Sequence, residues 1–365
     1  MSDTASANTI HQTNTIHHTD PIHPANPTPI SSPTIVSHTH ELIGHTPIYQ
    51  LEHDFVPAGK SCYIKLEQFN PNLSIKDRTA WGLISQALAD GRLKRDGVII
   101  ESTSGNLGKS LAMLGASLGI KVIVVVDPKI SQTTLNWFKA YGAEVICVTT
   151  PDASGGYQSR RIEKVKELLS TLPNAYWPNQ YDNPDNPSYH EANTACEFDA
   201  LPFDMLVGCV STGGHLSGIA RGIKARHPGK KVLACDVVGS AVLGGQFRPY
   251  LLNGIGLAWR SDNTALEQFD ETMKVPDQLA ISMCHHIAAS RGLLLGGSAG
   301  LVLFAGLVAL QRREINSVVI VAPDTGINYL DSLYDHNWLQ SKGVELLDKP
   351  ALHHHITHFN PYDYD

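Results

Sequence analysis

The sequence predicts an α/β protein of two lobes, each a mostly parallel sheet flanked by helices, with the active site in the cleft between them. Short apolar runs at 98–101, 122–126 and 145–149 alternate with helical patterns at 109–118 and 132–141, a repeat of about 23 residues. The second half of the chain repeats this alternation. Turns of small and polar residues follow several runs, at the strand ends where ligands of such sheets bind.

The first half opens with alternating residues at 48–51 and 63–67, which predict strands. A long helix is expected from Ile75 to Ala89, with Ser74 as its N-cap and Asp77 completing a pair resembling a capping box. A further helix is expected at about 158–171, after the turn at 151–156. The Asn- and Pro-rich stretch 177–187 is expected to be a loop that crosses between the lobes.

The second half contains further apolar runs and helical patterns and shows no internal sequence repeat. The runs predict strands at 205–210, 232–237 and 317–322. The helical patterns predict helices at 217–226, 277–291 and 300–312.

Composition places the chain among globular proteins and narrows its partners. The 365 residues are 42% hydrophobic and 17% charged, enough to bury a sizeable core. A net charge of −7 without a basic cluster argues against nucleic acid and anionic membranes as partners. No apolar run approaches the roughly 20 residues of a spanning helix, and the N-terminus lacks the apolar segment of a secretory signal.

Six scattered cysteines contain no C-x-x-C pair, so we expect reduced thiols of a cytoplasmic protein and no structural zinc site. Residues 1–38 are rich in His, Thr and Pro, which predicts a disordered tail. Metal capture by the histidines of that tail is the weaker alternative, and no metal is predicted. The run His353 to His355 is expected to be a solvated tail in the same way.

The stretch from Glu101 to Gly108 is the one around which the chain is organised. It follows an apolar run and precedes a helical pattern, so unpaired N–H groups would face open space. Its hydroxyls and the Asn106 amide equip it to hold a small anion. A phosphate-binding nucleotide loop is excluded, because position 103 would have to be glycine and is Thr103. An ordinary capped helix start is the simpler alternative.

Three further loops carry groups that could do chemistry. Lys76 lies at a predicted helix start, where the helix dipole disfavours a cation, so it is a candidate Schiff-base former beside the alternative of a surface residue. The turn from Val210 to Gly218 follows a predicted strand and precedes a predicted helix. Its backbone N–H groups could bind a phosphate, and a purely structural Gly-Gly turn is the alternative. The turn from Leu295 to Gly300 projects one hydroxyl, Ser298.

Together these loops resemble the fold type II pyridoxal-phosphate (PLP) enzymes, a tryptophan synthase β-like fold, and among them the cysteine synthase family. The resemblance runs from about Glu41 to Leu346. Its motifs occur in the expected order: Gly44-His-Thr-Pro47, Asn70-Pro-Asn-Leu-Ser-Ile-Lys76-Asp-Arg, Thr103-Ser-Gly-Asn106, Asn179-Gln-Tyr181, Ser211 to His215, Gly254-Ile-Gly256 and Ser298.

The resemblance implies a role for each of these residues. Lys76 would be the Schiff-base residue and general base, and Ser298 would face the pyridine nitrogen. The substrate carboxylate would be bound by Thr103, Ser104, Gly105, Asn106 and Gln180, with Asn106 also bonded to the cofactor 3-hydroxyl and Gly254 facing the substrate. The cofactor phosphate would be held by Ser211, Thr212, Gly213, Gly214 and His215. A neutral hydroxyl at Ser298 suits β-elimination through an aminoacrylate over transamination.

Longer matches resemble one branch of the family, the N-(2-amino-2-carboxyethyl)-L-glutamate synthases of siderophore and antibiotic pathways. These matches are Glu101 to Gly108, Val126 to Ser131, Pro151 to Tyr157, Arg161 to Val165 and Ala175 to Tyr181. The branch implies a transferase that joins O-phospho-L-serine to the amino group of L-glutamate and releases phosphate. Its product is the precursor of L-2,3-diaminopropionate.

In that branch Arg161, Tyr181 and Ser211 would bind the phosphate of phosphoserine; a solvated helix arginine is the alternative for Arg161. Leu107 stands where cysteine synthases have a threonine. His215 replaces a small hydroxyl residue, so a hydrogen bond differs there or charge is gained at lower pH. Thr325 and Asn328 replace arginines common near the last strand.

The resemblance also implies a homodimer and a domain division. A large PLP-binding lobe would span 39–69 and 185–346, a small mobile lobe 70–184, and a C-terminal tail 347–365. Two alternatives remain: a cysteine synthase that uses O-acetylserine or O-phosphoserine with sulfide, and a catalytically silent homologue that serves as a regulatory partner. Leu107 and the segment 155–157 argue against the first, and intact Lys76, Asn106 and Ser298 against the second.

Overall fold

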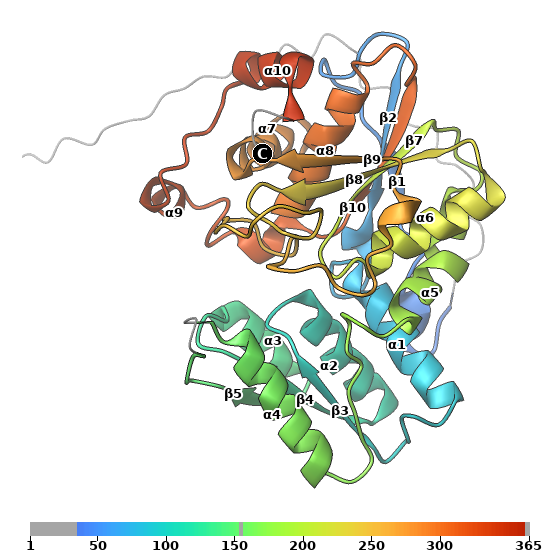
Figure 1. Ribbon diagram of the computed structural model, residues 1–365, viewed down its shortest axis with the longest axis vertical. Coiled ribbons are helices and arrows are strands. Elements are labelled where there is room, and N and C mark those ends of the chain that lie inside the picture. Colours follow the sequence, from blue (N-terminus) through green and yellow to red (C-terminus); the bar gives the residue numbers. More distant parts are fainter. Residues whose placement is uncertain (1–34, 153–155, 362–365) are drawn as a thin grey trace, which may run out of the picture. The chain divides into compact units, whose positions relative to one another are not determined.

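A computed structural model describes residues 35–152 and 156–361 (Figure 1). Residues from His38 onward form one compact unit. The predicted disordered tail, 1–38, lies almost wholly outside the described residues and stays a prediction. Within the part of the chain that the structure describes, no helix is both long enough and apolar enough to cross a membrane.

The larger of two sheets has the strand order β1-β2-β10-β7-β8-β9. Only the β1–β2 pair is antiparallel, and all other neighbours are parallel. The parallel strands are buried almost throughout, as expected for a sheet covered by helices on both faces. The strands are β1 (Ile48–Gln50), β2 (Ser61–Leu66), β7 (Met205–Cys209), β8 (Lys231–Val237), β9 (Glu271–Val275) and β10 (Ser317–Ala322).

The smaller sheet is entirely parallel, in the order β5-β4-β3-β6. Its strands are β3 (Val98–Ser102), β4 (Lys121–Val126), β5 (Glu144–Cys147) and β6 (Ala175–Tyr176). All four strands fall within 70–184, and those of the larger sheet fall outside that range. We therefore retain the two-lobe division as a proposal.

Helices cover both sheets (Figure 1). Along the chain they are α1 (Lys76–Ala89), α2 (Asn106–Leu118), α3 (Gln132–Ala140), α4 (Gln158–Thr171), α5 (Asp185–Ala192), α6 (Gly214–Arg226), α7 (Asp277–Arg291), α8 (Gly297–Ala309), α9 (His336–Ser341) and α10 (Lys349–His358). The short 3-10 helices are η1 (Thr39–Leu42), η2 (Glu67–Phe69), η3 (Thr194–Phe198), η4 (Leu266–Gln268) and η5 (Gly326–Tyr329). Every residue of α8 is buried, which fits a helix that is apolar on all faces.

The α/β prediction is confirmed, but three helices begin earlier than predicted. α2 begins at Asn106 instead of 109, α6 at Gly214 instead of 217, and α8 at Gly297 instead of 300. Each first turn contains glycine and polar residues, which are typical of loops in the sequence. As a result, Asn106, His215 and Ser298 belong to first helical turns, where backbone N–H groups lack intrahelical partners.

The predicted capping pair of Ser74 and Asp77 is confirmed only for Ser74. Its hydroxyl accepts from the backbone N of Lys76 (3.2 Å), the first residue of α1, whereas the Asp77 side chain bonds elsewhere. The Asp77 carboxylate instead accepts hydrogen bonds from the backbone N of Asn72 (2.7 Å) and from Ser110 Oγ. The Ser74 backbone also bridges to that of Asp324, which follows β10.

Several short elements were missed by the sequence reading. β6, β9 and α5 have no clear apolar period, and α5 begins at Asp185 inside the predicted loop 177–187. The prediction of a tail at His353 to His355 is wrong because these residues are helical, although His353 and His354 are exposed to solvent as predicted. These residues lie on α10, whose Leu352 and Ile356 are buried in the same core cluster as α7 and α8.

Replacing Leu352 with alanine should therefore destabilise the protein, because α10 would leave a cavity against α7 and α8. The expected loss is about 2–5 kcal/mol in the free energy of unfolding, measured by urea denaturation. His354, exposed on the same helix, offers the control, since His354→Ala should change stability by less than about 0.5 kcal/mol. Equal stabilities of the two variants would contradict the packing of α10.

Candidate active site

A single pocket collects most of the residues that the sequence singled out. Its volume is about 650 Å³, including space open to solvent. The lining comes largely from segments that follow the carboxyl ends of β3, β7 and β10, the expected place for a ligand in such sheets. The lining residues are Ser74, Ile75, Lys76, Thr103, Gly105, Asn106, Leu107, Gln180, Tyr181, Ser211, Thr212, His215, Gly254, Ser298, Pro323 and Asp324.

The Lys76 amine lies in this pocket at the first residue of α1. Burial lowers the pKa of Lys76, while Cys209 and Asp324 nearby act in the opposite direction. A lysine with a lowered pKa has a larger fraction of neutral, nucleophilic amine at neutral pH. The position and environment of Lys76 therefore suit the predicted role.

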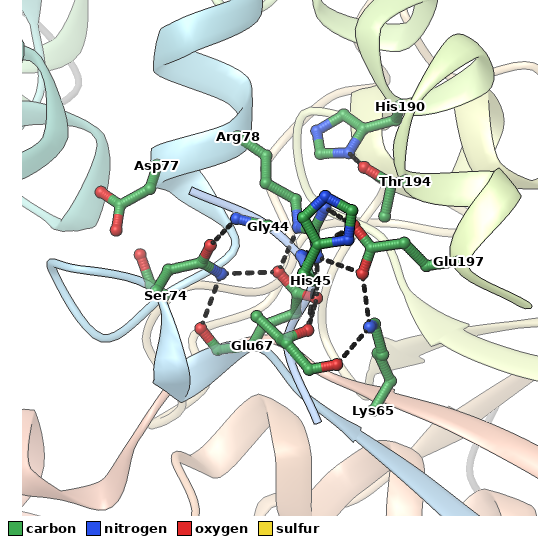
Figure 2. Close-up of polar contacts among 12 residues, drawn as sticks. Gly44, His45, Lys65, Glu67, Ser74, Asp77, Arg78, His190, Thr194 and Glu197 are labelled. Carbon is green, nitrogen blue, oxygen red and sulfur yellow. Dashed lines mark hydrogen bonds and ion pairs between the residues drawn. The ribbon is translucent and has the colours of Figure 1, made fainter. Parts of the chain in front are cut away.

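A buried cluster of charges anchors the start of α1 (Figure 2). The Arg78 guanidinium donates to Glu67 through Nε (2.7 Å) and Nη2 (3.0 Å), and it also donates to Glu197. Glu197 accepts from Lys65 as well. Arg78, Lys65 and Glu67 are almost completely buried. The cluster ties the helix that carries Lys76 to β2, η2 and η3.

The turn predicted from Gly44 to Pro47 belongs to the same cluster. The backbone N of His45 donates to Glu197 (3.0 Å), and Thr46 Oγ1 donates to Glu67 (2.8 Å). Figure 2 shows Gly44 and His45 directly beside Arg78. This turn therefore serves the position of α1 and does not line the pocket.

The predicted carboxylate loop ends in the first turn of α2. Thr103, Gly105 and Asn106 line the pocket, and Ser104 lies between them in the chain. The Asn106 side chain donates from Nδ2 to Asp324 (2.9 Å) and accepts at Oδ1 from Asn328 (3.3 Å). The orientation of its amide is thus fixed by contacts at both ends.

The predicted phosphate loop forms the first turn of α6. Gly213 has φ +77°, and a Cβ there would lie 2.3 Å from Thr264 Oγ1. A Cβ on Gly214 would lie 2.1 Å from Asn186 Oδ1, so both positions require glycine. Neither glycine lines the pocket directly, but Ser211, Thr212 and His215 beside them do.

Two buried polar atoms of the loop from Ser211 to His215 have no hydrogen-bond partner: Thr212 Oγ1 and His215 Nε2. Burial, with Lys76 nearby, lowers the pKa of His215 to about 3. Of the two expected consequences of a histidine here, a different hydrogen bond or a gain of charge at lower pH, the second is therefore wrong. Unpaired hydroxyl and imidazole groups at a helix N-terminus fit a phosphate ligand. The residues present therefore fit a phosphate-bearing cofactor.

Gln180, Tyr181 and Ser298 line other parts of the pocket. Ser298 is buried in the first turn of α8. The backbone carbonyl of Gln180 accepts from Asn186 Nδ2 (2.8 Å) and Asn263 Nδ2 (3.0 Å), which fixes the loop. Burial raises the pKa of Tyr181 to about 12, so its hydroxyl keeps its proton.

Arg161 does not line the pocket, but it is not a solvated helix arginine either. Its side chain on α4 is 12% exposed, and Nη1 lies 3.3 Å from Asp127 Oδ2. The buried Nε has no hydrogen-bond partner. The positive charge of Arg161 acts to lower the pKa of Tyr181, against the larger effect of burial. Arg160 beside it is exposed and pairs with Glu163 on the same helix. The two neighbouring arginines therefore have different environments.

Asp324 and Glu101 are two buried carboxyl groups that sequence reasoning did not assign to the site. Asp324 lines the pocket directly after β10, and the rule about strand ends could have found it. Glu101, on β3, accepts at Oε1 from Trp177 Nε1 (3.0 Å) and from the backbone N of Ser102 (2.8 Å). Its Oε2 is buried without a hydrogen-bond partner, and burial raises the pKa of Glu101 to about 7.

The chain is similar to known proteins over most of its length. The family model for pyridoxal-phosphate dependent enzymes matches residues 39–324. The N-(2-amino-2-carboxyethyl)-L-glutamate synthase of Ralstonia nicotianae is 39% identical over 86% of this chain and 96% of its own. The protein of that name from Cupriavidus metallidurans is 37% identical over 82% of this chain and 90% of its own.

Solved structures agree with this similarity. Cysteine synthase from Entamoeba histolytica superposes with a TM-score of 0.81 at 33% identity, covering 90% of this chain and 98% of its own. O-ureido-L-serine synthase superposes with a TM-score of 0.77 at 28% identity, covering 87% of this chain and 99% of its own. These similarities confirm the predicted fold type II architecture.

Removing the Arg78 guanidinium should leave the buried Glu67 without a charged partner and Glu197 with Lys65 as its remaining cation. We expect Arg78→Ala to lower the free energy of unfolding by about 3–5 kcal/mol, measured by urea denaturation. Arg92, whose side chain is 42% exposed and which pairs with Asp90 and Asp185, is the matched control. Arg92→Ala should have a much smaller effect. A similar loss in both variants would show that the cluster does not anchor α1.

Glu101 should make stability depend on pH. Its folded pKa is raised from 4.5 to about 7, so its contribution is fully present below pH 4.5 and is lost as pH rises towards 7. Between pH 5 and 8 the unchanged protein should lose about 2–3 kcal/mol more stability than Glu101→Gln, which keeps the Oε1 acceptor. Urea denaturation at both pH values measures this difference, and parallel pH slopes would refute the assignment.

Proposed function

The chain belongs to the family of pyridoxal-phosphate dependent enzymes, and from that premise we propose that it joins O-phospho-L-serine to L-glutamate. The product would be N-(2-amino-2-carboxyethyl)-L-glutamate, with release of phosphate. The first turns of α2, α6 and α8 all contribute residues to the pocket that holds the Lys76 amine. This convergence carries the proposal, because three helix N-termini suit a cofactor phosphate and a substrate rich in carboxylates.

Each part of the pocket has a proposed task. The turn from Ser211 to His215 would hold the cofactor phosphate, Ser298 would serve its pyridine nitrogen, and Asn106 its 3-hydroxyl. The substrate carboxylate is bound by Thr103, Ser104, Gly105, Asn106 and Gln180, with Gly254 facing the substrate. When bound, the cofactor withdraws electrons from the α-carbon of the substrate.

Lys76 moves the protons. As general base its amine removes the α-proton, after which the Cβ–O bond breaks and phosphate leaves with the electron pair. The glutamate amino group then forms the new Cβ–N bond and gives up a proton, and Lys76 returns a proton to the α-carbon. The lowered pKa of Lys76 supports this cycle, because the amine must be neutral before it can accept a proton.

The phosphate of the donor substrate is assigned to Arg161, Tyr181 and Ser211. Tyr181 and Ser211 line the pocket, and the Arg161 charge acts to lower the pKa of Tyr181, which supports a role for Arg161 on the Tyr181 side. The buried Nε of Arg161 has no hydrogen-bond partner and supports the same assignment, because it can donate to a phosphate oxygen. The product would lead to L-2,3-diaminopropionate, and a cytoplasmic homodimer is proposed from family resemblance alone.

Phosphate release by the purified, PLP-loaded protein tests this function. We expect release from O-phospho-L-serine to require L-glutamate and to yield a joined diamino-dicarboxylate, identified by mass. Lys76→Ala should lose turnover by at least about 10³-fold, because the general base and the covalent attachment are both removed. Lys121→Ala, on an exposed lysine at the start of β4, should leave turnover unchanged.

Other outcomes would redirect the assignment. Turnover with sulfide but not with glutamate would make the chain a cysteine synthase, the function named for the Entamoeba histolytica structure. Activity with O-acetylserine but not O-phosphoserine would refute the roles of Arg161 and its neighbours. Absence of the absorbance of a lysine-bound cofactor would favour a silent regulatory homologue.

A further inference from the structure

The segment Pro323 to Thr325, directly after β10, lies between two parts of the site. The carbonyl of Pro323 accepts from the backbone N of Ile75 (2.8 Å), next to Lys76. The carbonyl of Asp324 accepts from the backbone N of Gly296 (3.2 Å), at the start of α8. Its backbone thus joins the segment that carries Lys76 to the segment that carries Ser298.

The Asp324 side chain adds a third connection. Its Oδ2 accepts from Asn106 Nδ2 (2.9 Å) and from the Tyr329 hydroxyl (2.6 Å). Oδ1 is buried without a hydrogen-bond partner and packs on Gly296, where a Cβ would lie only 1.9 Å away. The carboxyl group therefore has a fixed orientation, with Oδ2 committed to Asn106.

The other end of the Asn106 amide is held as well. Its Oδ1 accepts from Asn328 Nδ2 (3.3 Å), and Asn328 Oδ1 accepts from Lys109 Nζ (2.7 Å). Lys109 is buried, with its amine 4.2 Å from the centre of the Trp137 ring. The Asn106 amide cannot exchange its nitrogen and oxygen ends without losing both contacts.

An asparagine amide has two N–H donors, and Asp324 takes one of them. The second remains for a ligand in the pocket. Without Asp324 only the 3.3 Å contact from Asn328 would oppose rotation of the amide, and a rotated amide would present its oxygen, which cannot donate to the oxygen of a cofactor hydroxyl. Asp324 and Asn328 together therefore set which end of Asn106 can serve the cofactor, and the 2.9 Å contact with Asp324 is the shorter of the two.

We propose that Asp324 is a positioning residue that fixes the Asn106 amide and so orients the cofactor ring between Lys76 and Ser298. The proposal rests on the proposed role of Asn106 and deepens it. Its basis is the contact of Asp324 Oδ2 with Asn106, together with the backbone contacts of the same segment. A carboxylate and a neutral acid both accept at Oδ2, so the role requires acceptor geometry and not charge.

The electrostatic environment supports this reading. Burial raises the pKa of Asp324 to about 6, against the opposing effects of Tyr329, Asn106, Lys109 and Lys76. At pH 7 a carboxyl group with this pKa is mostly ionised, and its ionised form accepts hydrogen bonds as its neutral form does. It remains well suited to accepting hydrogen bonds from an amide and a phenol.

The test measures the PLP-loaded protein without substrate. We expect Asp324→Ala to weaken cofactor binding about tenfold, the consequence of one misdirected hydrogen bond, and to shift the visible absorbance of the lysine-bound cofactor. Asp324→Asn keeps a carbonyl oxygen toward Asn106 and should retain both properties. Asp236→Asn is the matched control, because Asp236 is also buried with a pKa raised to about 6 but does not line the pocket.

A double-mutant cycle separates positioning from a general structural effect. In an Asn106→Ala background, Asp324→Ala should cause no further loss of cofactor affinity. Unchanged absorbance and affinity in Asp324→Ala would overturn the proposal, and so would equal losses in Asp324→Ala and Asp324→Asn. If the unchanged protein releases no phosphate yet Asp324→Ala still shifts the absorbance, the proposed reaction fails and the role of Asp324 stands.

Discussion

The buried charge cluster around Arg78 is the constraint on which the site depends. The Lys76 amine must remain available for chemistry, so it cannot itself hold the helix in place. Arg78, two residues further along α1, supplies that anchor through Glu67 and Glu197 (Figure 2). Buried ion pairs are costly to desolvate and are not an efficient source of stability. Their donor and acceptor directions fix one arrangement, which apolar packing alone would specify less sharply.

The second constraint is that helix N-termini must come close to the ligand. α2, α6 and α8 each begin in glycine- and hydroxyl-rich segments, which weaken a helix but let backbone N–H groups approach the pocket. At the start of α6 glycine is also required by neighbouring residues. Asn186 and Thr264 occupy the space that side chains at Gly214 and Gly213 would need. The small residues at the start of α6 are thus explained by the close approach of α5 and of the loop that carries Thr264.

Much of this organisation could be predicted from the sequence, because buried parallel strands are continuous apolar runs and the site loops follow them. The helix starts were placed three residues late, since Gly and Ser resemble loop in any local reading. The burial of Arg161 depends on Asp127, 34 positions earlier, and no local pattern reveals that pairing. α10 was missed because its two buried residues, Leu352 and Ile356, stand among histidines. Asp324 was overlooked although it directly follows a predicted strand.

Asp324 is an acidic side chain in a pocket that is proposed to bind anions, and its contacts explain how both can occur together. It is the one carboxyl group among the described lining residues. A free carboxylate there would repel the substrate carboxylates and the phosphates. Burial favours its neutral form, and Oδ2 is already engaged by Asn106 and Tyr329. The segment that joins α1 to α8 needs a hydrogen-bond acceptor directed at Asn106. Asp324 supplies it with a carboxyl group whose raised pKa lowers its average charge and whose Oδ2 is occupied by two donors.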